Sequence, residues 1–198
     1  MSLRATFSQA TPAQIKQIIP PNVKAFLNPP TKSRRLSNRW LAQQAAKVSG
    51  KVLSIGSGSD KDGEGKLYRE YFVNATSYTT SEVSPDFNTD LVLDVRSMPQ
   101  ISDQSYDCVL CNGVLEHVDD DLAALREMQR ILRPAGVLLM GLPFRQAIHL
   151  APTDFRRYTE YGIRYLLAKN FEIIALDAID TSVKGFPTAY WVKARKLA

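Results

Sequence analysis

The chain has 198 residues, of which 44% are hydrophobic and 23% are charged. This composition is typical of a globular protein with one sizeable core, and no stretch approaches the roughly 20 apolar residues that span a bilayer. The N-terminus lacks the apolar segment of a secretory signal, so we expect a cytoplasmic protein without a membrane span. Two cysteines, Cys108 and Cys111, are too few for a disulfide framework and are expected to be buried thiols.

The net charge of +5 is unevenly distributed along the chain. Residues 1–51 contain nine Lys or Arg and no Asp or Glu, so the remainder is net acidic. Such a basic arm can contact the phosphate of a nucleic acid, a nucleotide-linked sugar or a lipid head group, or it can be a solvated extension or a targeting peptide. We therefore divide the chain into a basic N-terminal extension with a helix, residues 1–48, and a domain of residues 49–198.

Hydrophobic spacing predicts the elements in chain order. Residues 33–47 are expected to form a helix, which Gly50 ends, and the apolar run 51–55 a strand. The glycine-rich segment 56–65 cannot hold regular structure and is expected to be a loop. The pattern then predicts a short helix at 66–72, strands at 75–83, 91–95 and 106–112, a helix at 119–132, a strand at 137–144, a helix at 159–170 with Thr159 as its cap, and strands at 171–179 and 188–194.

Strands that alternate with helices are typical of an α/β fold with a mostly parallel sheet. The segment Asp180–Pro187 is too short for a crossover helix, so the last two strands are expected to form an antiparallel pair at one edge. Ligands of such sheets bind outside the carboxyl ends of the strands. The motifs at the predicted strand ends are therefore the candidates for function.

The first strand runs into the glycine-rich turn of VLSIGSGSD, residues 52–60, where a ligand can approach backbone N–H groups closely. A dinucleotide fingerprint is disfavoured because Lys61 occupies the position of its last glycine, and a Walker loop is excluded because no GK[ST] follows. Glu82 ends the second strand and offers two acceptor oxygens to the hydroxyls of a ribose. Asp94 ends the third strand and offers a second acceptor, suited to an adenine amino group.

Five motifs occur in a fixed order: VLSIGSGSD, SEVSP, LVLDVRSMP, SYDCVLCNGVLEHVDD and REMQRILRPAGVLLMGLPF. Together they resemble the class I S-adenosylmethionine-dependent methyltransferases, and they are most similar to the bacterial branch called the type 11 methyltransferase domain. The resemblance covers about residues 50–194. The segment 149–173 also resembles a stretch of that branch, many of whose members are assigned to glycan pathways.

The resemblance implies an α/β fold with a seven-stranded, mostly parallel Rossmann-like sheet in the order 3-2-1-4-5-7-6, an antiparallel edge strand and helices on both faces. It implies S-adenosylmethionine as the cofactor, across the ends of the first, second and fourth strands. Ser54 stands where the family usually has an acid, and Asp60 where it usually has a third glycine. The implied cofactor-binding residues are Gly56, Ser57, Gly58, Glu82, Val83, Asp94, Val95, Asn112 and Gly113.

The candidate catalytic residues are His117, His149 and Tyr158. His117 follows the fourth strand, where it could act as a base near the transferred methyl group, orient the loop or cap the next helix. The connection from His149 to Tyr158 is expected to bind the acceptor, with Asp154 and Tyr158 contacting hydroxyls and two arginines fixing an acidic group. Alternatively, those arginines pair with nearby acids and Tyr158 supports the following helix. With two histidines and no His/Cys cluster in the sequence, no metal site is expected.

The sequence therefore predicts methyl transfer from S-adenosylmethionine to a small-molecule or carbohydrate-like acceptor. Displacement at a sulfonium needs mainly proximity and orientation, and a general base only where the acceptor must lose a proton. A non-catalytic adapter of the same fold is an alternative. An RNA methyltransferase that uses the basic arm is another, less favoured because the basic residues are not interleaved with aromatic ones. Oligomeric state is left open.

Overall fold

The computed structural model describes residues 30–197. Most of the predicted basic arm, residues 1–29, lies outside the described residues. The helix predicted at 33–47 is present as α4, Lys32–Ala45, and it belongs to the compact unit that begins at Lys32 rather than to a separate extension. Within the described part of the chain, no helix is both long and apolar enough to cross a membrane.

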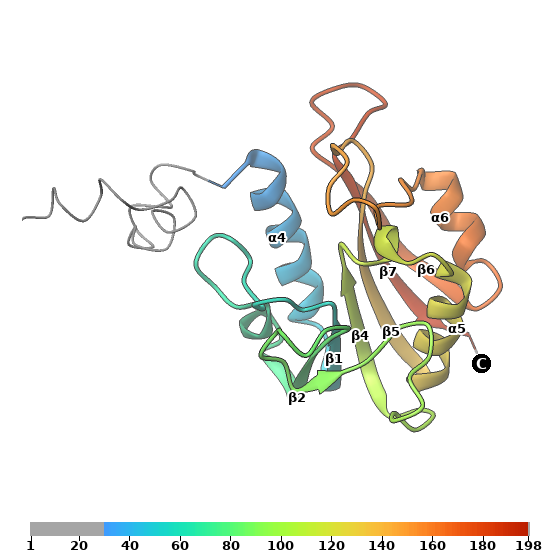
Figure 1. The fold of residues 1–198 in the computed structure, drawn as a ribbon. Coiled ribbons are helices and arrows are strands. Elements are labelled where there is room, and N and C mark those ends of the chain that lie inside the picture. Colours follow the sequence, from blue (N-terminus) through green and yellow to red (C-terminus); the bar gives the residue numbers. More distant parts are fainter. Residues whose placement is uncertain (1–29, 198) are drawn as a thin grey trace, which may run out of the picture. The chain divides into compact units, whose positions relative to one another are not determined.

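Seven strands form one sheet in the order β3-β2-β1-β4-β5-β7-β6, which confirms the predicted fold class (Figure 1). The first five strands pair in parallel, whereas β7 runs antiparallel to both β5 and β6. The antiparallel strand therefore lies next to the edge strand β6. The strands are β1 (Ser49–Ile55), β2 (Asn74–Glu82), β3 (Leu91–Val92), β4 (Tyr106–Asn112), β5 (Leu132–Pro143), β6 (Phe171–Ile179) and β7 (Ala189–Lys196).

Two strands differ in length from the prediction. The strand expected at 91–95 is reduced to β3, because the chain turns at Asp94, whose carboxylate accepts the backbone N–H of Arg96 at 2.9 Å. The strand expected at 137–144 begins at Leu132 instead. Its additional residues include Ala135 at a φ of +61°, and they form an irregularity in the register with β4. Both differences arise from turn geometry rather than from hydrophobic pattern.

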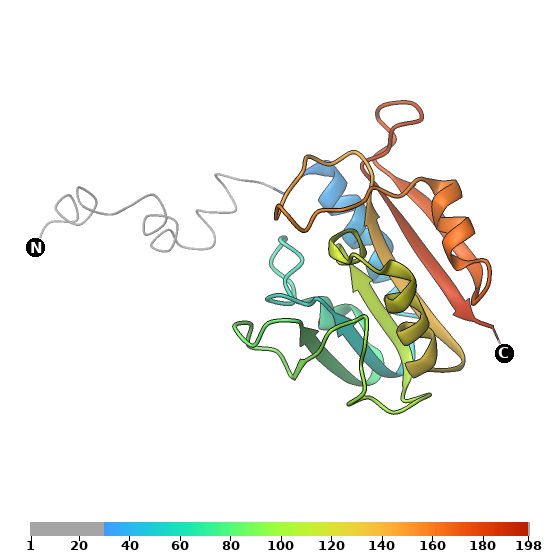
Figure 2. The same cartoon turned by 45° about the vertical axis from the view of Figure 1, so that its right-hand side comes forward.

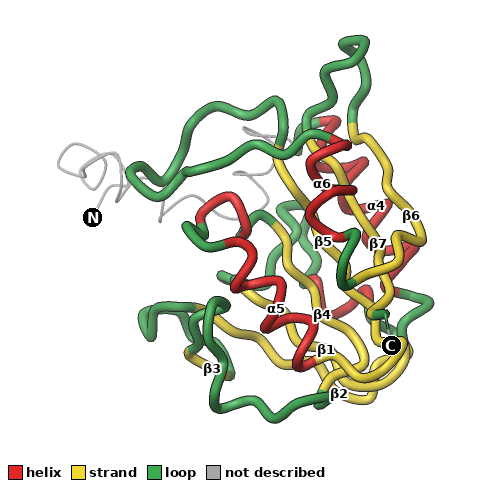
Figure 3. Tube along the Cα trace, turned by 90° about the vertical axis from the view of Figure 1, so that its right-hand side faces the viewer, coloured by secondary structure: helices red, strands yellow, loops and turns green. Residues whose placement is uncertain are grey.

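Helices cover both faces of the sheet, α4 on one and α5 and α6 on the other (Figures 2 and 3). α5, Asp121–Ile131, is capped by the Asp120 carboxylate, which accepts the N–H of Ala123. α6, Glu160–Leu167, is capped by Thr159 as predicted, because the Thr159 hydroxyl accepts the N–H of Gly162. The short helix predicted at 66–72 is a single 3-10 turn, η1, Tyr68–Tyr71.

Alternation along the strands divides the core into two layers. In β4, Val109 and Cys111 belong to the layer under α5 and α6, whereas Cys108 and Leu110 belong to the layer under α4. Both cysteines are free and fully buried, as predicted, and burial raises the pKa of each thiol. They are packing residues of opposite faces and not a redox pair.

α4 is anchored to the sheet by Trp40. Its indole stacks on Trp191 of β7 with ring centroids 5.2 Å apart and planes inclined by 30°. Its Nε1–H donates to Asp177 of β6 at 2.7 Å. One side chain thus links the helix to the two last strands through both apolar and polar contacts.

Trp40→Ala should lower the free energy of unfolding by about 3–5 kcal/mol, because it opens a cavity between α4 and the sheet. Trp40→Phe is the matched control with a smaller expected loss, since it keeps one ring on Trp191 and removes the second ring and the bond to the exposed Asp177 carboxylate, which water can replace. Urea denaturation followed by circular dichroism measures both. Equal stability of the Ala variant and the wild type would show that α4 is not part of the folded unit.

Candidate active site

A cleft of about 490 Å³ opens at the carboxyl ends of β1, β2 and β4. Six of the nine predicted cofactor residues line it: Gly56, Glu82, Val83, Asp94, Val95 and Gly113. The candidate catalytic residue His117 lines it as well. The other three predicted cofactor residues are not part of its lining: Ser57, Gly58 and Asn112. The other lining residues are mostly apolar: Ile55, Phe87, Leu93, Arg96, Val114, Val118, Asp119, Leu150, Thr153 and Phe155.

The glycine loop after β1 is tied to the end of β2. The carboxylate Oε1 of Glu82 accepts the backbone N–H of Gly58 at 2.7 Å. Ser57 donates its backbone N–H to the carbonyl of Ser81 at 3.0 Å. Gly56 and Gly58 have φ angles of +62° and +52°, a left-handed backbone that favours glycine. The loop therefore depends on the same carboxylate that the sequence assigns to the cofactor.

Asp60 occupies the position where the family usually has a third glycine, and it adopts a φ of +56°. Its carboxylate accepts the hydroxyl of Tyr78 at 2.9 Å and forms an ion pair with Arg69 at 2.9 Å. These two bonds hold a conformation that glycine adopts without strain. Ser54, the other departure, supports the loop through its carbonyl, which accepts the hydroxyls of Ser57 and Ser81.

Asp94 lines the cleft, but its carboxylate is already engaged. Arg96 Nη2 lies 2.6 Å from Asp94 Oδ2, and Arg96 Nη1 lies 2.7 Å from Asp119 Oδ1. The neighbouring guanidinium holds the pKa of the Asp94 carboxyl below its usual value. An adenine amino group would have to share this carboxylate with Arg96, a partner that the sequence analysis did not foresee.

The connection between β5 and α6 is organised by a buried carboxylate, Asp154, whose side chain is 1% exposed. It accepts the backbone N–H of His149 at 2.8 Å and both terminal nitrogens of Arg157, at 2.5 and 2.8 Å. Arg157 holds the pKa of the Asp154 carboxyl well below its usual range. Arg156 donates to the carbonyls of Val118 and Asp119. These contacts favour the alternative that Asp154 holds the loop, and its expected contact with acceptor hydroxyls stays a prediction.

Tyr158 is also a support of the scaffold. Its side chain is buried, and its hydroxyl donates to Asp121 Oδ2 at 3.0 Å at the start of α5. Burial raises the pKa of the Tyr158 phenol. Tyr158 is not part of the lining of the cleft. This position between two helices favours a supporting role, and the catalytic role expected from the sequence stays a prediction.

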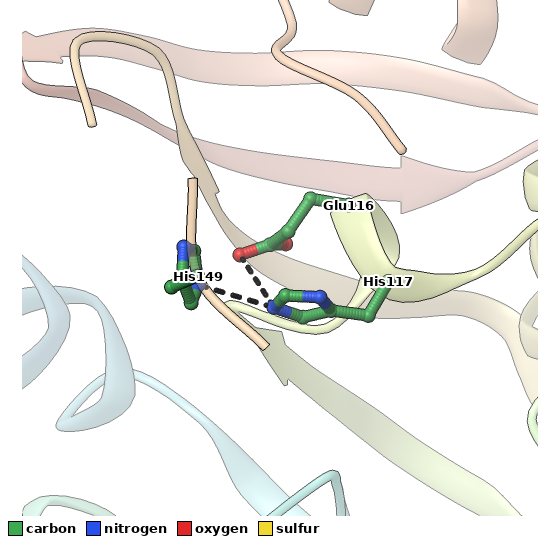
Figure 4. Close-up of side chains that lie close together, drawn as sticks. All are labelled: Glu116, His117 and His149. Atoms are coloured by element: carbon green, nitrogen blue, oxygen red, sulfur yellow. Dashed lines mark hydrogen bonds and ion pairs between the residues drawn. The ribbon is translucent and has the colours of Figure 1, made fainter. Parts of the chain in front are cut away.

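His117 and His149 meet although 32 positions separate them, with their Nε2 atoms 3.1 Å apart (Figure 4). Glu116 lies beside them, 2% exposed, and its Oε1 is 3.8 Å from His117 Nε2. The sequence analysis expected no cluster of this kind and did not select Glu116. The sequence feature that could have indicated the cluster is a carboxylate next to a histidine in the otherwise apolar segment GVLEHV.

Tyr158→Phe should lower the free energy of unfolding by about 1–3 kcal/mol, because the single hydroxyl hydrogen that the half-buried Asp121 carboxylate and the Leu115 carbonyl share is lost. The matched control is Tyr165→Phe on α6, where the side chain is 87% exposed and a change within about 0.5 kcal/mol is expected. Urea denaturation of the three proteins measures the effect. Unchanged stability of the Tyr158 variant would argue against the supporting role and restore Tyr158 as an acceptor contact.

Comparison with known proteins finds a family match for part of the chain. Residues 63–140 match a family model described as a methyltransferase domain. A segment of 71 residues is 38% identical to an uncharacterized 37.1 kDa protein in transposon TN4556 of Streptomyces fradiae. That match covers 34% of this chain and 20% of the relative, so the chain spans about one fifth of that protein.

Solved structures share the fold at low sequence identity. A 1,6-didemethyltoxoflavin-N1-methyltransferase of Burkholderia thailandensis, solved with S-adenosylhomocysteine and 1,6-didemethyltoxoflavin, is 18% identical with a TM-score of 0.64, over 96% of this chain and 92% of that one. The [4+2]-cyclase SpnF is 17% identical with a TM-score of 0.64, over 83% and 81%. The family match over residues 63–140 and the shared class I methyltransferase fold support the resemblance to the type 11 methyltransferase domain seen in the sequence.

Proposed function

We propose that this protein transfers a methyl group from S-adenosylmethionine bound in the cleft at the ends of β1, β2 and β4. The family match supports the reaction, and the fold relative that holds S-adenosylhomocysteine supports the cofactor. The observation that carries the proposal is the position of Glu82. Its carboxylate ends β2, lines the cleft and is oriented by the N–H of Gly58.

Glu82 has the capacity to bind a ribose without releasing the loop. A carboxylate offers about four lone-pair sites, and Gly58 takes one of them at Oε1. The backbone N–H of Val83 donates to Oε2 at 3.3 Å and takes a second site, so about two acceptor sites remain for a ligand. We therefore assign the two ribose hydroxyls to this carboxylate.

The remaining parts of the cofactor suit the other walls. Apolar side chains from the β3 end and from the segment after β4, Leu93, Val95 and Val118, offer flat contact to an adenine ring. Gly56 and Gly113 leave room for the methionine part and the sulfonium, because neither has a side chain. In this arrangement the protein supplies binding and orientation, and no covalent nucleophile is needed.

The acceptor is proposed to enter beside His117, Thr153 and Phe155, which line the same cleft. His149 is not part of the lining of the cleft, but its Nε2 lies 3.1 Å from Nε2 of His117, which is. A small-molecule or carbohydrate-like compound remains the proposed acceptor class. The support for it is the family resemblance of the segment 149–173 and the small heterocyclic compound held by the Burkholderia relative.

Glu82→Gln should weaken the binding of S-adenosylhomocysteine about 10- to 100-fold, because neutral oxygen replaces a charged acceptor of two hydroxyls. The amide oxygen of Gln can still accept the N–H of Gly58, so the loop should keep its path. Glu172→Gln on β6 is the matched control, since Glu172 is an exposed acid outside the cleft. Isothermal titration calorimetry compares the three proteins. Equal affinity of the Glu82 variant would place the ribose elsewhere.

Methyl transfer itself is tested by mass spectrometry of the wild-type chain incubated with S-adenosylmethionine and separate pools of hydroxyl-bearing small molecules, nucleotide sugars and RNA. The proposal expects S-adenosylhomocysteine together with an acceptor that is about 14 Da heavier in one of the first two pools, since CH₂ is the net gain. Methylation of RNA alone would favour the RNA alternative. Cofactor binding without any S-adenosylhomocysteine formed would favour the non-catalytic adapter.

A further inference from the structure

The rings of His117 and His149 are oriented by oxygen acceptors at their far nitrogens. His117 Nδ1 lies 2.8 Å from the carbonyl oxygen of Thr153, and His149 Nδ1 lies 3.1 Å from that of Ala147. A carbonyl oxygen can only accept, so each Nδ1 carries the hydrogen. In two neutral imidazoles the Nε2 atoms are then both lone-pair donors, and they face each other at 3.1 Å.

Two facing lone pairs repel unless a proton or a metal cation lies between them, and the carboxylate of Glu116 brings a third electron-pair donor to the same place. Its Oε2 is buried and has no hydrogen-bond partner among the described residues. Its other oxygen lies 3.8 Å from His117 Nε2, and one ligand atom from each of the three residues lies within 4.8 Å of the others. Burying a carboxylate without a partner is costly, so a cation would relieve two unfavourable contacts at once.

We propose that Glu116, His117 and His149 bind one divalent transition-metal ion. Ligand atoms about 2.1 Å from one ion are about 3 to 4 Å apart. Two of the spacings here, 3.1 and 3.8 Å, fall in that range, and all three ligand atoms lie within 4.8 Å of one another. Two imidazoles and one carboxylate form a ligand set that suits Zn²⁺ and its neighbours in the first transition row rather than Ca²⁺ or Mg²⁺. Small side-chain movements would bring the three ligand atoms to equal distances from the ion (Figure 4).

The surroundings of the three residues are those of a metal site. Metal-binding histidines usually donate their other ring hydrogen to a carbonyl or carboxylate, which fixes the ring. Both histidines do so here, and the buried Asp154 adds an Oδ2 atom 3.3 Å from His149 Nδ1. Asp154 is itself held by an ion pair with Arg157, so the His149 ring is positioned by a carboxylate that is fixed in turn.

The position of the cluster gives the ion a role in the proposed reaction, and this step rests on the proposed function. His117 lines the cleft, so an ion on its Nε2 lies at the wall assigned to the acceptor, with at least one coordination position left open. An acceptor hydroxyl bound there loses its proton to solvent more readily. The oxygen forms a bond to the methyl carbon as the carbon–sulfur bond breaks, giving a methyl ether, S-adenosylhomocysteine and the released proton.

Metal binding is tested without cofactor or acceptor, using the full chain free of any histidine tag. The protein is stripped with a chelator and titrated with Zn²⁺, Co²⁺ and Mn²⁺ by calorimetry, and the visible absorption of the Co²⁺ form reports nitrogen ligands. We expect one Zn²⁺ or Co²⁺ per chain and a higher melting temperature with the ion. His117→Ala, His149→Ala and Glu116→Gln should each weaken binding at least about tenfold, whereas Glu172→Gln should not.

Two results would overturn the proposal. In the first, the stripped wild-type protein is folded but binds none of the three ions with one-to-one stoichiometry. A shared proton alone would then lie between the histidines. Binding that is equally strong in the three variants, with unchanged far-UV circular dichroism, would show an adventitious ion only. Calorimetry with S-adenosylhomocysteine is independent of both, so a failure of the cofactor site and a failure of the metal site are told apart.

Discussion

Parallel pairing of β1 with both of its neighbours is the constraint on which the rest of the molecule depends. Because β1 pairs with β2 on one side and β4 on the other, all three carboxyl ends meet at one edge of the sheet. Gly56, Glu82 and Gly113 are therefore brought to one cleft from distant parts of the chain. Helices on both faces keep this sheet buried, which is the condition under which parallel strands are stable.

Local signals in the sequence predicted most of this frame. The apolar run of β4, the glycine turn after β1 and the cap at Thr159 each act over a few residues, so their effects could be read directly. The short last connection likewise predicted the antiparallel pair β6 and β7. What local signals could not predict is where a long loop returns, since that depends on bonds between residues far apart in sequence.

The connection before α6 illustrates this limit. Asp154 could equally have been an exposed ligand or a buried anchor, and only burial together with Arg157 decides between them. Once the anchor is in place, His149 is carried to His117, and a cluster arises that neither segment indicates alone. Asp60 shows that a local pattern can also be read too narrowly. Where the family that the sequence resembles usually has glycine, the backbone needs a left-handed conformation, and an aspartate with two partners adopts it here.

The stacked indoles have a consequence for how this protein can be observed. The chain holds two tryptophans, and both are in the pair formed by Trp40 and Trp191. Neither lines the cleft. The tryptophan emission of the protein thus originates from one place, the contact between α4 and the sheet. It is a built-in optical probe of whether that helix is docked, and a chromophore attached near the cleft is needed to follow ligands there.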